Sequence, residues 1–205
     1  MAHSTLKLFY FDTEGRAEVA RIILAAAGKT FQDIRCNEDD WLQQKTRAPY
    51  GQVPVLEVDG VAFAQSLAIN AFLAREFGFY GNTNLENFKI DEIVHLVNDF
   101  MTAATKVLFL TPNQEEQASG TRELKEETGP RMLGFLEKFL RSSGSGYFVG
   151  DRLTLADICV LDIVTGSFAL LLDVNNSYPL LRKNLELTKA HPKIGAYLIS
   201  RETRE

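Results

Sequence analysis

The first half of the chain switches between two spacings of apolar side chains. Residues 5–11 alternate apolar and polar positions, which predicts a half-buried strand. After a turn-like Asp-Thr-Glu-Gly, apolar residues recur at helical spacing until Gly28, a residue suited to a helix C-terminus. Residues 31–35 predict a second strand, and Asp39 or Asp40 is the expected N-cap of a short second helix.

A hairpin and a third helix follow. Residues 53–58 and 61–64 predict two strands, because the Asp-Gly pair between them favours a tight turn. Ser66 is the expected start of a helix that ends at Gly78. The predicted order is therefore β-α-β-α-β-β-α. A helix between the first two strands implies a parallel pair and the hairpin adds an antiparallel edge, so we expect a small mixed sheet covered by helices.

The second half of the chain predicts helices only. From residue 85 onward the apolar positions follow the 3.6-residue period, and residues 121–141 predict a helix bent at a Gly-Pro pair. The stretch 153–172 is apolar on nearly every face and is the expected central helix of this half. A short polar segment separates the two patterns, so we predict an α/β domain of residues 1–80 and an all-helical domain of residues 85–205.

Thr154 and Asp157 match a capping box at the start of that central stretch. In this motif the two side chains satisfy backbone N–H groups that the helix itself leaves unpaired. The motif explains both residues, so we assign them no chemistry.

Composition and charge narrow the range of partners. The chain has 205 residues, of which 45% are hydrophobic and 24% charged, so it can bury a core. Its formal net charge of −5 and the lack of a Lys/Arg run disfavour nucleic-acid and anionic-membrane partners. Charged residues interrupt the N-terminal region and no apolar run reaches the ~20 residues of a membrane span. We therefore expect a cytoplasmic protein.

Cysteines and histidines are sparse. Cys36 and Cys159 do not form a C-x-x-C pair, and a disulfide framework needs more of them, so both thiols are expected to be reduced. The histidines are isolated and lack the spacing of a metal motif. We therefore predict no metal site.

Five motifs occur in the order seen in one enzyme family. They are LFYFDTEGRAEVARIILAAAG, DW…K, PYGQVPVLEVDG, QSLAINAFLAREFG and DFM. Over essentially its whole length the sequence resembles the cytosolic glutathione transferases, and within them the sigma class, which includes helminth, mollusc and insect transferases, glutathione-dependent prostaglandin D synthases and lens S-crystallins. The resemblance implies a thioredoxin-like N-terminal domain that binds glutathione, a helical domain that lines the electrophile site, and a homodimer.

The resemblance also implies which residues bind glutathione, a peptide with two carboxylates, one ammonium and a thiol. Gln65 and Ser66, at a helix start, would bind the γ-glutamyl carboxylate. Trp41, Lys45 and Gln52 would lie at the glycyl carboxylate. Glutathione would be the co-substrate, with no metal.

Two further contacts follow from the same resemblance. The bond between Val53 and Pro54 is expected to be cis, which turns the Val53 backbone toward the cysteinyl residue of glutathione. Asp99 would reach across the dimer to the γ-glutamyl ammonium, so each subunit would complete the site of the other.

Tyr10 corresponds to the catalytic tyrosine of the sigma class. A phenol has a pKa of ~10 and a thiol one of ~8.5, so a neutral tyrosine is expected to donate a hydrogen bond to the glutathione thiolate rather than act as a base. Such a bond contributes roughly 1.5–3 kcal/mol, which lowers the thiol pKa by about one to two units. Arg16 would add a positive charge near the sulfur.

Each of these residues has a simpler interpretation when it is taken alone. Tyr10 fits a half-buried strand position, and Trp41 could merely cover the short helix. Lys45, Arg16 and Asp99 could be solvated surface charges. Their joint order favours the glutathione site.

Two positions depart from the sigma-class pattern. Glu14 stands where many members have arginine or another non-acidic residue, and is expected to weaken the field of Arg16 at the sulfur. The segment around Asp99 lacks the acidic cluster of the prostaglandin-isomerising vertebrate members, and Lys106 stands near their tryptophan. The missing acidic cluster and the missing tryptophan disfavour a divalent-metal effect and a prostaglandin pocket.

The predicted function is conjugation of glutathione to small hydrophobic electrophiles, with peroxidase or isomerase chemistry as a side activity. Phe11, Thr13 and residues 102–110, including Lys106, are expected to line the electrophile site. Two alternatives stay open: a glutathione-dependent prostaglandin D isomerase, and a ligand carrier of low activity similar to the S-crystallins.

Overall fold

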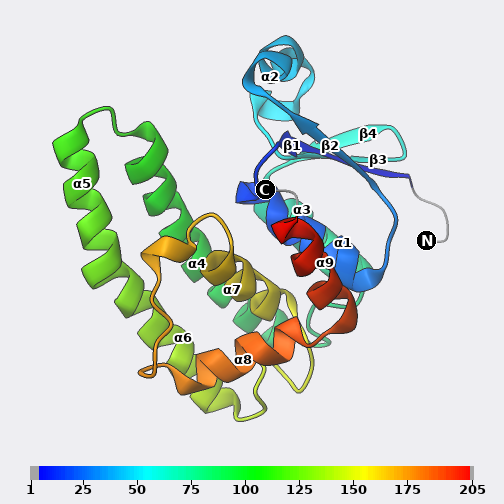
Figure 1. The fold of residues 1–205 in the computed structure, drawn as a ribbon. Helices are drawn as coiled ribbons and strands as arrows, with labels where there is room; N and C mark the ends of the chain where they lie inside the picture. Colours follow the sequence, from blue (N-terminus) through cyan, green and yellow to red (C-terminus); the bar gives the residue numbers. More distant parts are fainter. Residues whose placement is uncertain (1–4, 204–205) are drawn as a thin grey trace. The chain divides into compact units, whose positions relative to one another are not determined.

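A computed structural model describes residues 5–203 of the chain, apart from the side chains of residues 47 and 202. These residues form two compact units (Figure 1). One contains the described residues up to Phe79 together with those from His191 onward, and the other is Tyr80–Ala190. The last helix therefore groups with the N-terminal unit, whereas its sequence pattern had placed it in a helical domain of residues 85–205.

The N-terminal unit is built on a four-stranded sheet. Its strands are β1 (Leu6–Phe11), β2 (Gln32–Cys36), β3 (Val55–Val58) and β4 (Val61–Ala64). Their spatial order is β2-β1-β3-β4, with β1 and β2 parallel and the other two pairs antiparallel. The predicted mixed sheet is confirmed, but β3 begins at Val55 rather than at residue 53, because Pro54 has no N–H for the strand ladder.

Helices cover both faces of this sheet (Figure 1). α1 (Glu18–Ala27) and α3 (Ser66–Glu76) lie on one face, and α2 (Glu38–Gln44) lies on the other. α9 (Pro192–Glu202) packs against α1. Three 3₁₀ turns connect the elements, namely η1 (Gly15–Ala17), η2 (Lys45–Arg47) and η3 (Pro49–Gly51).

Most helix ends in this unit agree with the sequence signals. Gly28, with φ of 66°, ends α1, and Ser66 begins α3. The predicted N-cap of α2 is wrong, because the Asn37 side chain accepts the Asp40 N–H at 2.8 Å. Asp39 and Asp40 instead lie in the first helical turn, where the positive end of the helix dipole stabilises their charge.

The second unit is helical, as predicted. Its elements are α4 (Asn84–Leu110), α5 (Gln114–Glu123), η4 (Leu124–Thr128), α6 (Gly129–Ser143), α7 (Leu155–Thr165), η5 (Ala169–Leu171) and α8 (Pro179–Lys189). The single helix predicted for residues 121–141 is instead α5 and α6, which join through one π-helical turn, η4. Pro130 cannot donate a backbone hydrogen bond, and a widened turn just before it is a common way to absorb that loss.

The predicted central helix is shorter than its apolar stretch. α7 ends at Thr165 because Gly166 leaves the helical region of φ and ψ, and η5 takes up part of the remaining apolar run. All residues from Leu155 to Ile163 are buried, which confirms the central position of α7 in its unit. The capping box of Thr154 and Asp157 is also confirmed.

α4 is long and apolar enough to cross a membrane when only length and composition are considered, which holds for no other helix in residues 5–203. Its most apolar window is 33% buried inside the protein. Core helices meet the same criterion, so this property is weak evidence for a membrane span.

Candidate functional site

A cleft of about 510 Å³ lies in the N-terminal unit. It is formed by the end of β1, η1, α2 with η2, the segment before β3, and the start of α3. Its lining residues are Phe11, Arg16, Trp41, Lys45, Gly51, Gln52, Val53, Pro54, Gln65 and Ser66. All of these except Gly51 were singled out in the sequence, so the fold brings widely separated candidates to one place.

The start of α3 forms one end of the cleft. Ser66 is the first helical residue, so the N–H groups of this turn have no partner within the helix. Gln65, just before it, has φ of 73°, a left-handed conformation that is strained for a residue with a side chain. Its Nε2 donates to Gln52 Oε1 at 3.3 Å. Helix N-termini of this kind attract carboxylates.

The segment that precedes β3 lies between the two ends. Val53 and Pro54 are joined by a cis peptide bond, the geometry that the resemblance implied. Pro54 is buried, whereas Val53 is half-buried and lies outside the strand. A peptide ligand could therefore meet the Val53 backbone at the edge of the sheet.

Trp41 and Lys45 form the other end of the cleft. The Trp41 ring packs against Phe9 and Phe11, with ring centroids 6.4 Å and 6.2 Å away. Trp41 thus packs on side chains of β1, rather than only covering its short helix, and lines the cleft as well. Lys45 is exposed and lies at the first position of η2, so its ammonium is available to a carboxylate.

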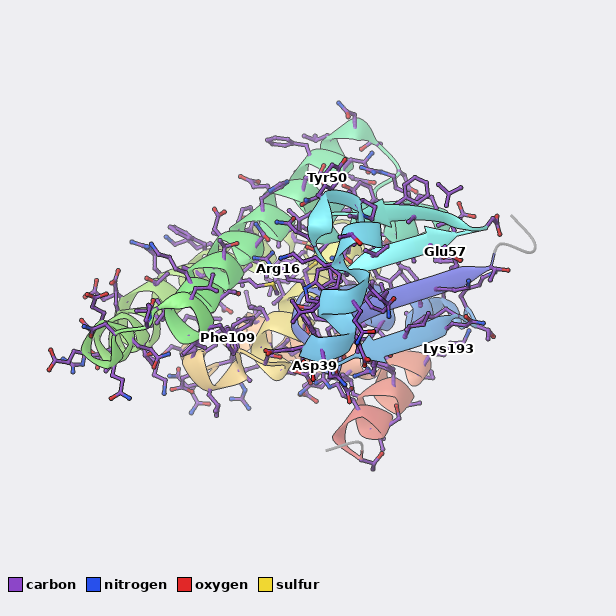
Figure 2. All side chains as sticks on the ribbon, turned by 90° about the horizontal axis from the view of Figure 1, so that it is seen from above. Arg16, Asp39, Tyr50, Glu57, Phe109 and Lys193 are labelled. Carbon is purple, nitrogen blue, oxygen red and sulfur yellow. The ribbon has the colours of Figure 1, made fainter. Side chains whose placement is uncertain are left out.

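Tyr10 lies next to the cleft rather than among the residues that line it. Its side chain is 8% exposed on the buried face of β1, and its Oη accepts the backbone N–H of Arg16 at 3.1 Å. Gly15 makes this contact possible, because a Cβ atom at that position would lie 2.6 Å from the Tyr10 Oη. Figure 2 labels Arg16 toward the carboxyl end of β1.

The turn between Tyr10 and Arg16 is held by an arginine that the sequence analysis missed. Arg21 is fully buried, and its Nη1 donates to the carbonyl of Thr13 at 2.7 Å. Its guanidinium carbon lies 5.9 Å from the centroid of the Tyr10 ring. A helix-spaced pair with Glu18 was the one available signal, since the two are three residues apart.

Glu14 is ion-paired in the structure. Its Oε1 lies 3.0 Å from Nε of Arg201 on α9, so the negative charge that was expected to weaken the field of Arg16 is offset by a residue far along the chain. Nothing in the local sequence signals this pairing.

The remaining predicted residues are not among those that line the cleft. Thr13 is exposed in the turn after β1. Asp99 and Lys106 are exposed on α4, in the other unit. Among the residues that the structure describes, no group of three His, Cys, Asp or Glu side chains could hold a metal ion.

Both cysteines, Cys36 and Cys159, are buried and form no disulfide. Burial raises the pKa of the Cys36 thiol, and it raises that of Cys159 strongly. Neither is therefore suited to act as a thiolate nucleophile near neutral pH.

A second hollow, of about 600 Å³, lies in the helical unit beside α8. Its lining combines apolar side chains with Arg182, Lys183 and Lys189. None of the predicted binding residues is there, so the cleft of the N-terminal unit is the candidate site.

Comparisons with known proteins agree with this choice. The profile of the glutathione S-transferase N-terminal domain matches residues 4–75, and that of the C-terminal domain matches residues 98–201. Glutathione S-transferase 1 of Ascaris suum is 38% identical over 198 residues, which cover 95% of this chain and 96% of the relative. The chain belongs to the glutathione S-transferase family.

Two further comparisons fit the sigma-class resemblance of this transferase. S-crystallin SL11 of Nototodarus sloanii is 35% identical over 203 residues, with 95% of each chain covered. The solved structure of prostaglandin synthase D of Nilaparvata lugens superimposes with a TM-score of 0.87 at 29% identity, and covers 96% of this chain and 98% of the other. The thioredoxin-like N-terminal fold and the helical C-terminal fold are those of the family.

Proposed function

We propose that this transferase binds glutathione in the cleft of the N-terminal unit and transfers its sulfur to small hydrophobic electrophiles. The observation that supports this most directly is the convergence of three different groups on one cleft: the N-terminus of α3, the Val53 backbone, and Lys45 beside Trp41. These groups match the γ-glutamyl carboxylate, the peptide middle and the glycyl carboxylate of glutathione.

Tyr10 is the proposed catalytic residue. Because its oxygen accepts the Arg16 N–H, its own proton is available for a hydrogen bond to the glutathione sulfur. A hydrogen bond to an anion contributes roughly 1.5–3 kcal/mol, which corresponds to a thiol pKa lowered by about one to two units. Arg16 lines the same cleft, so its charge favours the thiolate further.

The thiolate would then attack the electrophile, forming a carbon–sulfur bond and displacing a leaving group or adding to an activated double bond. Phe11 and Thr13 of the N-terminal unit, with Lys106 of α4, are the proposed contacts of the electrophile. Peroxidase or isomerase chemistry would use the same thiolate, so it is a side activity of the same site.

Two alternative functions use the same fold. The likeness to prostaglandin synthase D favours an isomerase, and the likeness to an S-crystallin favours a carrier with little turnover. Tyr10 and Arg16 are both present and joined by a hydrogen bond, which favours an active enzyme over a carrier. Lys106 near the position of the vertebrate tryptophan disfavours the prostaglandin isomerase.

A homodimer in the cytoplasm is part of the proposal. Asp99 is exposed on α4, where a partner subunit could bring it to the γ-glutamyl ammonium. Sedimentation equilibrium would measure the oligomeric state, and Asp99→Asn would be expected to raise KM for glutathione while leaving that state unchanged.

The direct test is an assay of the purified full chain with glutathione and a chromogenic aryl halide, an enal and a lipid hydroperoxide. We expect thioether formation well above the uncatalysed rate, with kcat/KM half-maximal at a pH about one to two units below the free thiol pKa of ~8.5. No conjugation with any electrophile would support the carrier, and turnover of prostaglandin H2 alone would support the isomerase.

A further inference from the structure

Two arginines from other elements, Arg21 and Arg201, bind the turn that carries Arg16. On the inner side, Nη1 of Arg21 donates to the carbonyl oxygens of Thr13 at 2.7 Å and Glu14 at 3.4 Å. On the other side, Nε of Arg201 pairs with the Glu14 carboxylate at 3.0 Å. The side chains of Arg201 and Glu14 are only 12% and 18% exposed, so solvent screens this pair weakly.

Arg201 is itself fixed by a buried carboxylate of α1. Its Nη1 lies 3.2 Å from Oε1 of Glu18, a side chain that is 1% exposed. Tyr197, one helical turn earlier on α9, donates its hydroxyl to the same oxygen at 2.8 Å. The other carboxylate oxygen of Glu18 pairs with Arg21 at 3.1 Å. A continuous ionic chain therefore runs from Glu14 through Arg201 and Glu18 to Arg21.

We propose that Arg201 is a positioning residue for the thiolate site: it neutralises Glu14 and holds the turn that presents the Arg16 N–H to Tyr10. This inference rests on the proposed role of Tyr10. It concerns a residue of the last helix that lies outside the cleft, so Arg201 acts on glutathione only through Glu14 and the turn.

Neutralisation of Glu14 matters because the short turn holds its carboxylate close to Arg16. Glu14 is two residues from Arg16, and an unpaired carboxylate there would oppose the positive field of Arg16 at the sulfur. The charged and titratable groups packed around the turn come from two helices, two strands and the turn itself, and are Tyr10, Arg16, Glu18, Arg21, Asp33, Tyr197 and Arg201. Of these, Arg201 pairs with the Glu14 side chain at 3.0 Å.

α9 also offers a control, since it contacts α1 at both ends. Lys193, at its N-terminal end, donates to the carbonyl of Ala27 at 3.4 Å, near the C-terminus of α1. In Figure 2 the label of Lys193 lies to the right of that of Arg16. Lys193→Gln thus removes a cation and a contact from α9 without touching the turn.

The experiment titrates the ultraviolet absorbance of the thiolate in the glutathione complex and measures kcat/KM against pH. Arg201→Gln is expected to raise the thiol pKa by about half to one unit, and so to lower kcat/KM about three- to tenfold below pH 7, with KM for glutathione nearly unchanged. Arg201→Lys retains the charge and should recover most of the shift. Lys193→Gln should leave the thiol pKa at its wild-type value.

Two variants of Glu14 distinguish an electrostatic role of Arg201 from a purely structural one. In the double variant Glu14→Gln with Arg201→Gln, the thiol pKa should return close to the wild-type value, because the opposing carboxylate is gone. If the double variant stays as impaired as Arg201→Gln, α9 only supports the fold and the inference is overturned.

Glu14→Gln alone keeps the test usable if Arg201→Gln fails to fold. Removing the carboxylate should lower the thiol pKa by a few tenths of a unit, so a rise would overturn the inference. The wild-type titration tests the underlying proposal separately. No thiolate band below pH 8 in the wild-type complex would count against Tyr10 itself, whatever the Arg201 variants do.

Discussion

Two buried carboxylates, one in each unit, stabilise the start of a helix in different ways. Asp157 of α7 is fully buried, and its partners are uncharged. It accepts hydrogen bonds from the N–H of Thr154 at 2.8 Å, the N–H of Phe148 at 3.1 Å and Nδ2 of Asn184 at 2.7 Å. Burial raises the pKa of Asp157 and these bonds lower it, with burial the larger effect.

Glu18, at the start of α1, is equally buried but has charged partners. It pairs with Arg21 and Arg201 and accepts the hydroxyl of Tyr197. Because the two arginines also bind the turn at Glu14, a change in this cluster is felt at the residues beside the cleft. The neutral donors around Asp157 thus stabilise one helix start locally, whereas the ionic partners of Glu18 connect separate regions of its unit.

The largest expected effect is the loss of stability on removal of Asp157 from its neutral hydrogen-bond donors. Asp157→Ala leaves buried N–H groups of Thr154 and Phe148 without their acceptor, so it should lower the free energy of unfolding by ~2–4 kcal/mol. Urea denaturation measures this value. Asp151→Ala, at an exposed position in the same unit, is the control and should change stability by less than about 0.5 kcal/mol. Equal effects of the two substitutions would refute the structural role of Asp157.

The next largest effect is expected for Tyr10→Phe, which should change catalysis rather than stability. Removing the hydroxyl removes the hydrogen bond to the thiolate, worth roughly 1.5–3 kcal/mol, so kcat/KM should fall by about 10- to 100-fold near neutral pH. KM for glutathione should change little, because the binding groups lie elsewhere in the cleft. Steady-state kinetics across pH measure both values, and an unchanged kcat/KM would remove Tyr10 from the mechanism.

A pair of glycine substitutions isolates the close contact at the turn. Gly15, with φ of 43°, and Gly60, with φ of 85°, both have left-handed backbones, but only at Gly15 would a Cβ atom meet the Tyr10 hydroxyl. Each change to alanine should cost about 1–2 kcal/mol of stability for the backbone alone. Only Gly15→Ala should also reduce kcat, because it displaces the phenol. Similar kinetics for both variants would argue against the contact.

The smallest effect is expected at the thiols. Because burial raises the pKa of Cys36 and Cys159, little of either is thiolate near neutral pH, and the thiolate fraction grows only as pH rises. Iodoacetamide should therefore modify the folded protein far more slowly than the urea-unfolded chain. Mass spectrometry at pH 7.5 would show this, and rapid labelling of the native protein would contradict it.

Local features were predicted well because neighbouring residues determine them. The hairpin of β3 and β4, the end of α1 at Gly28, the start of α3 at Ser66 and the capping box at Thr154 each depend on a few adjacent side chains and on backbone sterics. The errors are also local. Asn37 competed with two aspartates for the same cap, and a π turn replaced a simple bend.

The sequence by itself determined the order of elements, the family resemblance and the side chains that line the cleft. Only the tertiary structure decided that α9 joins the N-terminal unit, and that Glu14 pairs with Arg201. The physical reason is that an ion pair depends on distance in space. Residues 187 positions apart along the chain carry no shared periodicity or motif that would reveal the contact, and packing of α9 on α1 is what brings them within 3.0 Å.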